Sequence, residues 1–151
     1  MNKLRVGICG WGNVATGLFK TLQTNSVEIK KRSNLEIEII AIGARRDNPK
    51  CDPGNVIIER DIFKVIEHDI DVVVELIGGV DIARDLILKA LNAKKHVVTA
   101  NKAVIFNHGN ELFSVANKNG VKLLYESSVC AGTPIICLLY TSDAADEPRC
   151  V

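Results

Sequence analysis

Five short, almost wholly apolar runs recur along this chain, separated by longer segments in which apolar residues follow a helical spacing. The runs are rich in β-branched residues and predict strands at Leu4–Cys9, Leu35–Ile42, Asp71–Ile77, His96–Thr99 and Val121–Tyr125. A strand without a polar side is buried on both faces, as happens when helices cover both sides of a parallel sheet. The alternation therefore predicts a doubly wound α/β fold with right-handed crossovers.

Amphipathic helices are expected between these strands. Their apolar faces are predicted at Val14, Leu18 and Leu22, at Ile82, Leu86 and Ala90, and at Leu112, Val115 and Ala116. The many turn-forming residues between Arg45 and Glu59 predict an irregular surface loop.

Composition narrows the class of protein. Of the 151 residues, 47% are hydrophobic and 25% are charged, which suits one domain with its own core. The formal net charge of +1 gives no overall attraction to nucleic acid or to an acidic membrane. The five scattered cysteines form no Cys-x-x-Cys pair, and no apolar run approaches the roughly 20 residues of a membrane helix. We expect a reduced, cytoplasmic protein without a membrane or nucleic-acid partner.

A glycine-rich segment, Gly7 to Ala15, follows the first expected strand and opens the first expected helix. It has the G-x-G-x-x-A form of the dinucleotide-binding fingerprint. Gly10 permits a tight turn, Gly12 lets the backbone approach a pyrophosphate, and free N–H groups from Asn13 onward can hold phosphates. An ordinary strand-to-helix turn is the alternative. The position after the first strand favours a nucleotide site on a Rossmann-type sheet with helices on both faces.

Two arginines follow the second strand, where an NAD-binding chain would carry a carboxylate for the ribose hydroxyls. Arg45 and Arg46 can pair with the 2′-phosphate of NADP in bidentate fashion, and Asp47 leaves room for NAD as well. The alternative is a pair of solvated loop arginines.

The third and fourth expected strands also end in polar or glycine-rich segments. Gly78 and Gly79 would let the backbone run alongside the nicotinamide ribose. Glu75 is either a structural acid with satisfied hydrogen bonds or a helper at the cofactor. Lys102, which ends a Thr-x-Asn-Lys segment, can hydrogen-bond the substrate carbonyl or the cofactor, although a lysine at a loop start is usually only solvated.

Four separated blocks in this order resemble homoserine dehydrogenase. They run from Gly10 to Val14, from Val73 to Gly79, from His96 to Ala103 and from Leu124 to Ile136. The likeness covers about residues 3 to 137 and is far more specific than the fingerprint alone. It implies the NAD(P)H-dependent interconversion of aspartate 4-semialdehyde and L-homoserine, in threonine and methionine biosynthesis, by an enzyme that is homo-oligomeric at full length.

The resemblance also implies roles for residues at matching positions. It assigns the phosphate loop to Gly10, Gly12, Asn13 and Val14, the 2′-phosphate contact to Arg46, and the nicotinamide side to Ile77, Gly78, Ala100 and Lys102. Lys102 is also the implied catalytic residue. A loop binding Na⁺ or another monovalent cation is implied at Glu126, Val129, Ala131 and Thr133, where hard oxygen ligands are available.

The likeness ends after Ile136, and the stretch from Tyr140 to Val151 lacks a hydrophobic period. We expect an NAD(P)-binding domain at residues 1–139, a non-native or disordered tail at 140–151, and no substrate domain. Such a fragment would be inactive by itself. The alternative is a non-catalytic NAD(P)-sensing module, which would not need Lys102 or the loop from Glu126 to Thr133.

Overall fold

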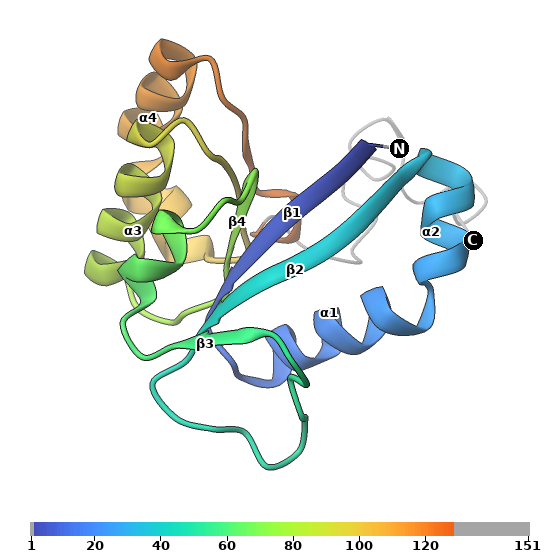
Figure 1. The fold of residues 1–151 in the computed structure, drawn as a ribbon. Coiled ribbons are helices and arrows are strands. Elements are labelled where there is room, and N and C mark those ends of the chain that lie inside the picture. The colour runs from blue at the N-terminus through green and yellow to red at the C-terminus, as the bar shows by residue number, and fades with distance from the viewer. Residues whose placement is uncertain (1, 129–151) are drawn as a thin grey trace, which may run out of the picture.

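A parallel β-sheet runs through the computed structural model of the chain, which describes residues 2–128 (Figure 1). Its strands are β1 (Asn2–Cys9), β2 (Leu35–Gly43), β3 (Ile57–Glu59), β4 (Val72–Glu75), β5 (His96–Thr99) and β6 (Leu123–Leu124). They lie side by side in the order β3-β2-β1-β4-β5-β6, and every pairing is parallel. This is the doubly wound order, so the predicted fold class is confirmed. The last part of the predicted domain, residues 129–139, and the predicted tail at 140–151 lie outside the described residues.

Helices cover both faces of the sheet. The α-helices are α1 (Asn13–Thr24), α2 (Ser26–Ser33), α3 (Asp81–Asn92) and α4 (Lys102–Asn119), and the 3₁₀ helices are η1 (Ile62–Glu67) and η2 (Glu126–Ser128). Figure 1 shows α1 and α2 on one side of the sheet and α3 and α4 on the other.

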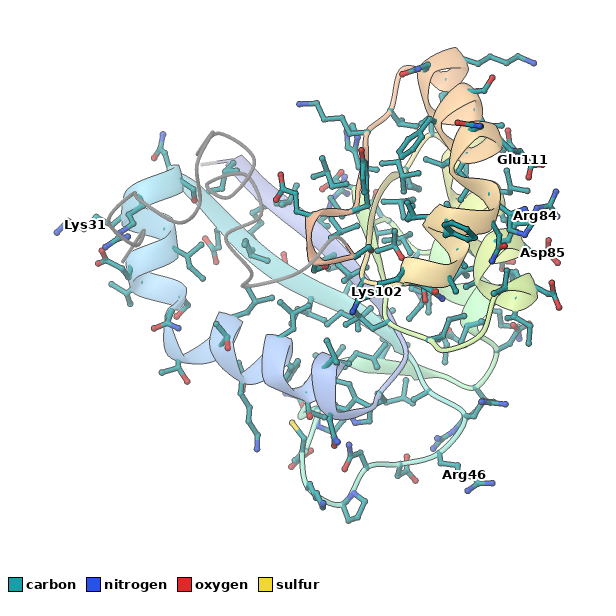
Figure 2. All side chains as sticks on the ribbon, turned by 180° about the vertical axis from the view of Figure 1, so that it is seen from behind. Lys31, Arg46, Arg84, Asp85, Lys102 and Glu111 are labelled. Atoms are coloured by element: carbon teal, nitrogen blue, oxygen red, sulfur yellow. The ribbon has the colours of Figure 1, made fainter. Side chains whose placement is uncertain are left out.

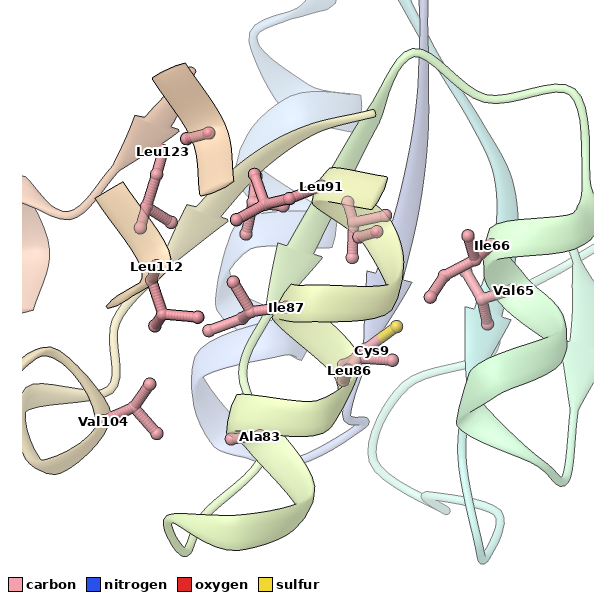
Figure 3. Packing of buried hydrophobic residues seen from close by; sticks show 14 of the residues in the cluster. Cys9, Val65, Ile66, Ala83, Leu86, Ile87, Leu91, Val104, Leu112 and Leu123 are labelled. Atoms are coloured by element: carbon pink, nitrogen blue, oxygen red, sulfur yellow. The ribbon is translucent and has the colours of Figure 1, made fainter. Parts of the chain in front are cut away.

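The alternate side chains of each central strand enter different cores, which explains why these strands carry no polar side. On β1, Cys9 packs toward α3 and η1 while Ile8 packs toward α1, and Val73 and Val74 divide in the same way on β4. Figure 3 shows the core beneath α3, where Leu86, Ile87 and Leu91 are fully buried. Burial of each such side chain stabilises the fold by about 1.5–3 kcal/mol.

Two of the predicted helix faces are wrong at their first residue. Val14 and Ile82 are 64% and 56% exposed, and the buried faces begin one residue later, at Ala15 and Ala83. Both exposed residues lie in the first turn of a helix at the carboxyl edge of the sheet, beyond the reach of the core. The third predicted face is confirmed by the burial of Leu112 and Ala116.

The predicted irregular loop from Arg45 to Glu59 contains a short strand, β3, which extends the sheet beside β2. Only three residues form β3, which is too few to show the alternation of residues that predicts a strand, and turn-forming residues precede it. The helix α2 was not predicted either. It has no buried residue, and therefore no apolar face from which a helical period could be recognised.

Among residues 2–128, no helix is long and apolar enough to cross a lipid bilayer. Cys9 and Cys51 are both buried thiols. Burial raises the pKa of Cys9 to about 12, with a smaller contribution from the nearby Glu75, so this thiol stays protonated and unreactive.

A two-point ion pair joins β1 to the start of β4 at the amino edge of the sheet. The Nε and Nη2 atoms of Arg5 donate to Asp71 at 3.1 and 2.8 Å, and the Arg5 backbone N–H donates to the same carboxylate at 2.8 Å. These hydrogen bonds lower the pKa of Asp71 from 3.8 to about 2. Because the pKa is lower in the folded chain, the resulting stability is present above about pH 4 and is lost as the pH falls toward 2.

Asp71→Asn should therefore lower the free energy of unfolding at pH 7 by about 1 kcal/mol, a modest figure because both side chains are about one-third exposed. Urea denaturation between about pH 7 and pH 2 should show the difference between parent and variant closing at acid pH. Asp69→Asn is the matched control, since Asp69 faces the same arginine with 82% of its side chain exposed, and it should have a smaller effect. A stability difference that stays constant down to pH 2 would contradict this account of Asp71.

Candidate functional site

A cleft of about 690 Å³ opens at the carboxyl edge of the sheet, where β1, β2 and β4 end. The chain winds from β1 toward β2 in one direction, whereas β4 lies on the other side of β1. Doubly wound sheets bind ligands at this kind of switch point. Five of the residues selected from the sequence lie together in its wall, namely Gly10, Arg45, Arg46, Ile77 and Gly78.

The turn after β1 passes so close to the end of β4 that only glycine fits at position 10. Gly10 has a φ of +109°, and a Cβ there would lie 2.6 Å from the carbonyl oxygen of Leu76. Its N–H donates to the Gly43 carbonyl at 2.8 Å, which ties the turn to the end of β2 as well. The glycine predicted for a tight turn is therefore required by backbone contacts on both sides.

The first turn of α1 presents its backbone N–H groups without a side-chain cap. Gly12 is the N-cap residue, and Gly12, Asn13 and Val14 are all exposed. A Cβ at Gly12 would meet nothing within 4 Å, so the chain itself does not require a glycine there. A helix N-terminus that is open in this way, beside a cleft, suits a phosphate group.

Arginines gather at the β2 end of the cleft. Arg45 and Arg46 are exposed, and neither forms an ion pair with another described residue. Figure 2 shows Arg46 projecting from the loop that follows β2. Arg60, which sequence analysis missed, also lines the cleft, and it donates to Asp47 at 2.7 Å and to the Ala44 carbonyl at 3.3 Å. It directly follows β3, so the missed strand hid its proximity to the other two arginines.

Glu75 is fully buried at the end of β4, and its two oxygens accept different hydrogen bonds. The Ile77 N–H donates to one oxygen at 2.8 Å, and the Thr99 hydroxyl donates to the other. Burial raises the pKa of Glu75, while these hydrogen bonds oppose the rise. Among the two alternatives left by the sequence, this geometry corresponds to the structural acid with satisfied hydrogen bonds.

Lys102 is the first residue of α4, and its exposed side chain has no ion-pair or hydrogen-bond partner among the described residues. Figure 2 shows it at the start of the helix, well separated in that view from Arg46. Neither Lys102 nor Ala100 lines the cleft wall. Both nevertheless lie at the same edge of the sheet, because β5 runs parallel to β4 and ends level with it.

The implied cation loop begins at Glu126, which is exposed in η2. Val129, Ala131 and Thr133 lie outside the described residues. Within residues 2–128, no group of three or more His, Cys, Asp or Glu side chains is arranged to hold a metal ion.

Residues 10–126 match the family model described as "Homoserine dehydrogenase, NAD binding domain". The homoserine dehydrogenase of Pseudomonas aeruginosa is 51% identical over 137 residues, which cover 90% of this chain and 32% of that relative. The enzyme of Neisseria gonorrhoeae is 36% identical over 154 residues, covering 100% of this chain and 35% of the relative. This chain therefore spans about a third of the length of these relatives.

Solved structures agree with the sequence matches. A homoserine dehydrogenase from Thiobacillus denitrificans superposes with a TM-score of 0.83 at 38% identity, covering 92% of this chain and 33% of that one. A hyperthermophilic archaeal homoserine dehydrogenase in complex with NADPH superposes with a TM-score of 0.71 at 25% identity, covering 91% of this chain and 48% of that one.

The two fingerprint glycines should respond differently to the same substitution. Gly10→Ala forces a side chain against the Leu76 carbonyl at positive φ and should lower the free energy of unfolding by several kcal/mol. Gly12→Ala meets open space and should leave stability within about 0.5 kcal/mol while weakening nucleotide binding. Thermal unfolding and calorimetric titration with NADPH measure the two effects. Equal stability of the two variants would show that the close approach at Gly10 is not a constraint on the fold.

Proposed function

Because the chain belongs to the homoserine dehydrogenase family, we propose that it forms the cofactor-binding part of an oxidoreductase that interconverts L-homoserine and L-aspartate 4-semialdehyde with NADP(H). The observation that carries this proposal is the cleft at the switch point, which has arginines at one end, a glycine-containing loop at the other, and the open N-terminus of α1 beside it. The substrate is a small molecule, and the cofactor is a nicotinamide dinucleotide.

The pyrophosphate would lie across the turn between β1 and α1. The Gly10 backbone fixes this turn, and the N–H groups of Asn13 and Val14 would donate to phosphate oxygens. The exposed surface at Gly12 supports this placement, since the absence of a Cβ leaves room for a ligand and serves no contact within the chain.

The 2′-phosphate of the adenosine ribose would bind at the arginine end. Arg45 and Arg46 have no competing carboxylate among the described residues, so both can turn toward a phosphate. The Asp47 carboxylate is already paired with Arg60, which reduces its availability for ribose hydroxyls. These observations favour NADP(H), with NAD(H) as a weaker alternative cofactor.

The nicotinamide half would lie along Ile77, Gly78 and Ala100, at the ends of β4 and β5. When bound, the nicotinamide ring supplies or accepts the hydride. The ammonium group of Lys102 would hydrogen-bond the oxygen of the reacting substrate group and stabilise the negative charge that develops there during reduction of the aldehyde. The exposed position of Lys102 at the start of α4 leaves it free to do so.

The segment that begins at Glu126 is proposed to bind Na⁺ or another monovalent cation through oxygen atoms, as the sequence resemblance implies. Comparing NADPH affinity in NaCl and in choline chloride at equal ionic strength tests this proposal, and equal affinities would count against it.

Arg46→Ala should reduce the preference for NADPH over NADH, because losing a charge-assisted hydrogen bond to phosphate costs on the order of 1.5–3 kcal/mol. We expect a loss of NADPH affinity of about tenfold or more and little change for NADH. Calorimetric titration measures both affinities, with Lys31→Ala on the exposed surface of α2 as the charge-matched control (Figure 2). An unchanged ratio of the two affinities would remove Arg46 from the 2′-phosphate site.

In an active enzyme that contains this chain, Lys102→Ala should lower kcat/KM for homoserine by about 100-fold or more, because the ammonium acts chiefly in the transition state. Lys118→Ala, which removes a charge from the other end of the same helix, should leave kcat/KM unchanged. Activity of the Lys102 variant within about threefold of the parent would exclude it from the mechanism.

The 151-residue chain by itself should bind NADPH without oxidising homoserine. The described residues offer a cofactor cleft but only one candidate substrate contact, whereas positioning the substrate is worth about 7–11 kcal/mol of the barrier. A spectrophotometric assay with saturating NADP⁺ and homoserine should show no NADPH formation above that of an Arg46→Ala, Lys102→Ala double variant. Turnover above this control would contradict the expectation.

A further inference from the structure

A buried polar network lies beneath the loop that follows β4. Glu75 and Thr99 are the last residues of adjacent strands, are paired in register, and are both fully buried. The Thr99 hydroxyl donates to one carboxylate oxygen of Glu75, and the Ile77 N–H donates to the other. The end of β4, the first residues after it and the end of β5 are thus joined by hydrogen bonds, and the bond between Thr99 and Glu75 is fully buried, where such bonds are strong.

Asn101 extends this network in two directions at once. Its backbone N–H donates to the Thr99 hydroxyl oxygen at 3.0 Å, which holds the backbone of Asn101 against the end of β5. The Oδ1 atom caps α4 by accepting the Val104 N–H at 3.2 Å. The Nδ2 group donates to the carbonyl oxygen of Gly79 at 2.6 Å and to that of Ile77 at 3.4 Å. One amide side chain therefore connects the loop after β4 with the first turn of α4.

The loop has few other means of holding its shape. Gly78 and Gly79 are exposed and have no side chains to pack, and Gly79 has a φ of +89°. A segment of this composition has many accessible conformations, so fixing one of them requires specific hydrogen bonds. A helix cap alone needs only the oxygen of Asn101. The two bonds from its nitrogen to loop carbonyls serve no purpose in capping.

We propose that Asn101 is a positioning residue that holds the Ile77–Gly79 loop against the start of α4, so that the surface for the nicotinamide half and Lys102 keep a fixed relative position. This inference rests on the proposed function, because it concerns the same cofactor. It adds that the nicotinamide end of the site is preorganised by Asn101, which contacts neither cofactor nor substrate in this role, whereas the adenosine end does not depend on it.

Asn101→Ser tests the proposal because serine can still cap α4 but cannot donate to both loop carbonyls. In the 151-residue chain, calorimetric titration compares NADPH with 2′,5′-ADP, which carries the adenosine and 2′-phosphate but no nicotinamide. The variant should bind NADPH on the order of tenfold more weakly than the parent and bind 2′,5′-ADP equally well. Asn110→Ser, at an exposed position of the same helix, should bind both ligands as the parent does.

The other possible outcomes of this experiment would refute either the positioning role of Asn101 or the proposed function. Equal weakening of both ligands would make Asn101 a general structural residue, and unchanged affinity for both would show that the loop does not need it. If Asn101→Ser does not fold, Asn101→Thr replaces it, because threonine also caps a helix through its hydroxyl group, and failure of both to fold would also refute a positioning role. A parent that binds NADPH no more tightly than 2′,5′-ADP would refute the positioning proposal alone. A parent that binds neither ligand would contradict the proposed function.

Discussion

The cleft depends on the close approach of two backbones at the end of β1. The Leu76 N–H donates to the Cys9 carbonyl, and one residue later Gly10 turns away with no room for a side chain beside the Leu76 carbonyl. The same turn is bonded to Gly43 at the end of β2. Three strand ends are thereby held around one point. The direction of α1, the position of its open N-terminus and the floor of the cleft all follow from this contact.

The two ends of the cleft differ in their polar groups, which are exposed cations at one end and buried, hydrogen-bonded groups at the other. At the β2 end, cations collect on surface loops, where only Arg60 is held by a partner among the described residues. At the β4 end, the polar groups are buried and hydrogen-bonded, and they shape the backbone of the loop above them. The first end is suited to recognising charge and the second to fixing geometry. A dinucleotide with a phosphate at one end and a reactive ring at the other requires both.

The sequence was sufficient to predict the fold class because strands buried on both faces carry a strong signal. The five apolar runs all became strands, and the glycine fingerprint fell between β1 and α1 as predicted. Single-residue errors at Val14 and Ile82 arose because an apolar residue in the first turn of a helix can face the cleft edge and still fit the helical period. The strand β3 is too short to show a period, and α2 is largely polar with no buried residue, so the existence of these two elements could not be predicted.

The features of the site that could not be predicted from the sequence depend on contacts between residues that are distant in the chain. Arg60 reaches the cleft only because β3 joins the sheet, and the pairing of Glu75 with Thr99 depends on the register of two strands far apart in the chain. The double role of Asn101 is likewise invisible without the position of the Gly79 carbonyl. Within residues 2–128, the predicted site residues divide into those that line the cleft and those, including Lys102, that lie beside it at the same edge.

The central claim is that one cofactor spans the cleft from the arginine loop to the Ile77–Gly79 loop across the turn at Gly10. The most direct measurement is a titration of the ¹⁵N-labelled chain with NADPH, followed by amide chemical shifts in NMR spectra. If the cofactor binds in this way, saturable shifts are expected at the turn from Gly10 to Val14, at Arg45 and Arg46, and at the loop after β4, with α2 unaffected. Shifts confined to other parts of the described chain, or shifts that exclude the turn at Gly10, would contradict it.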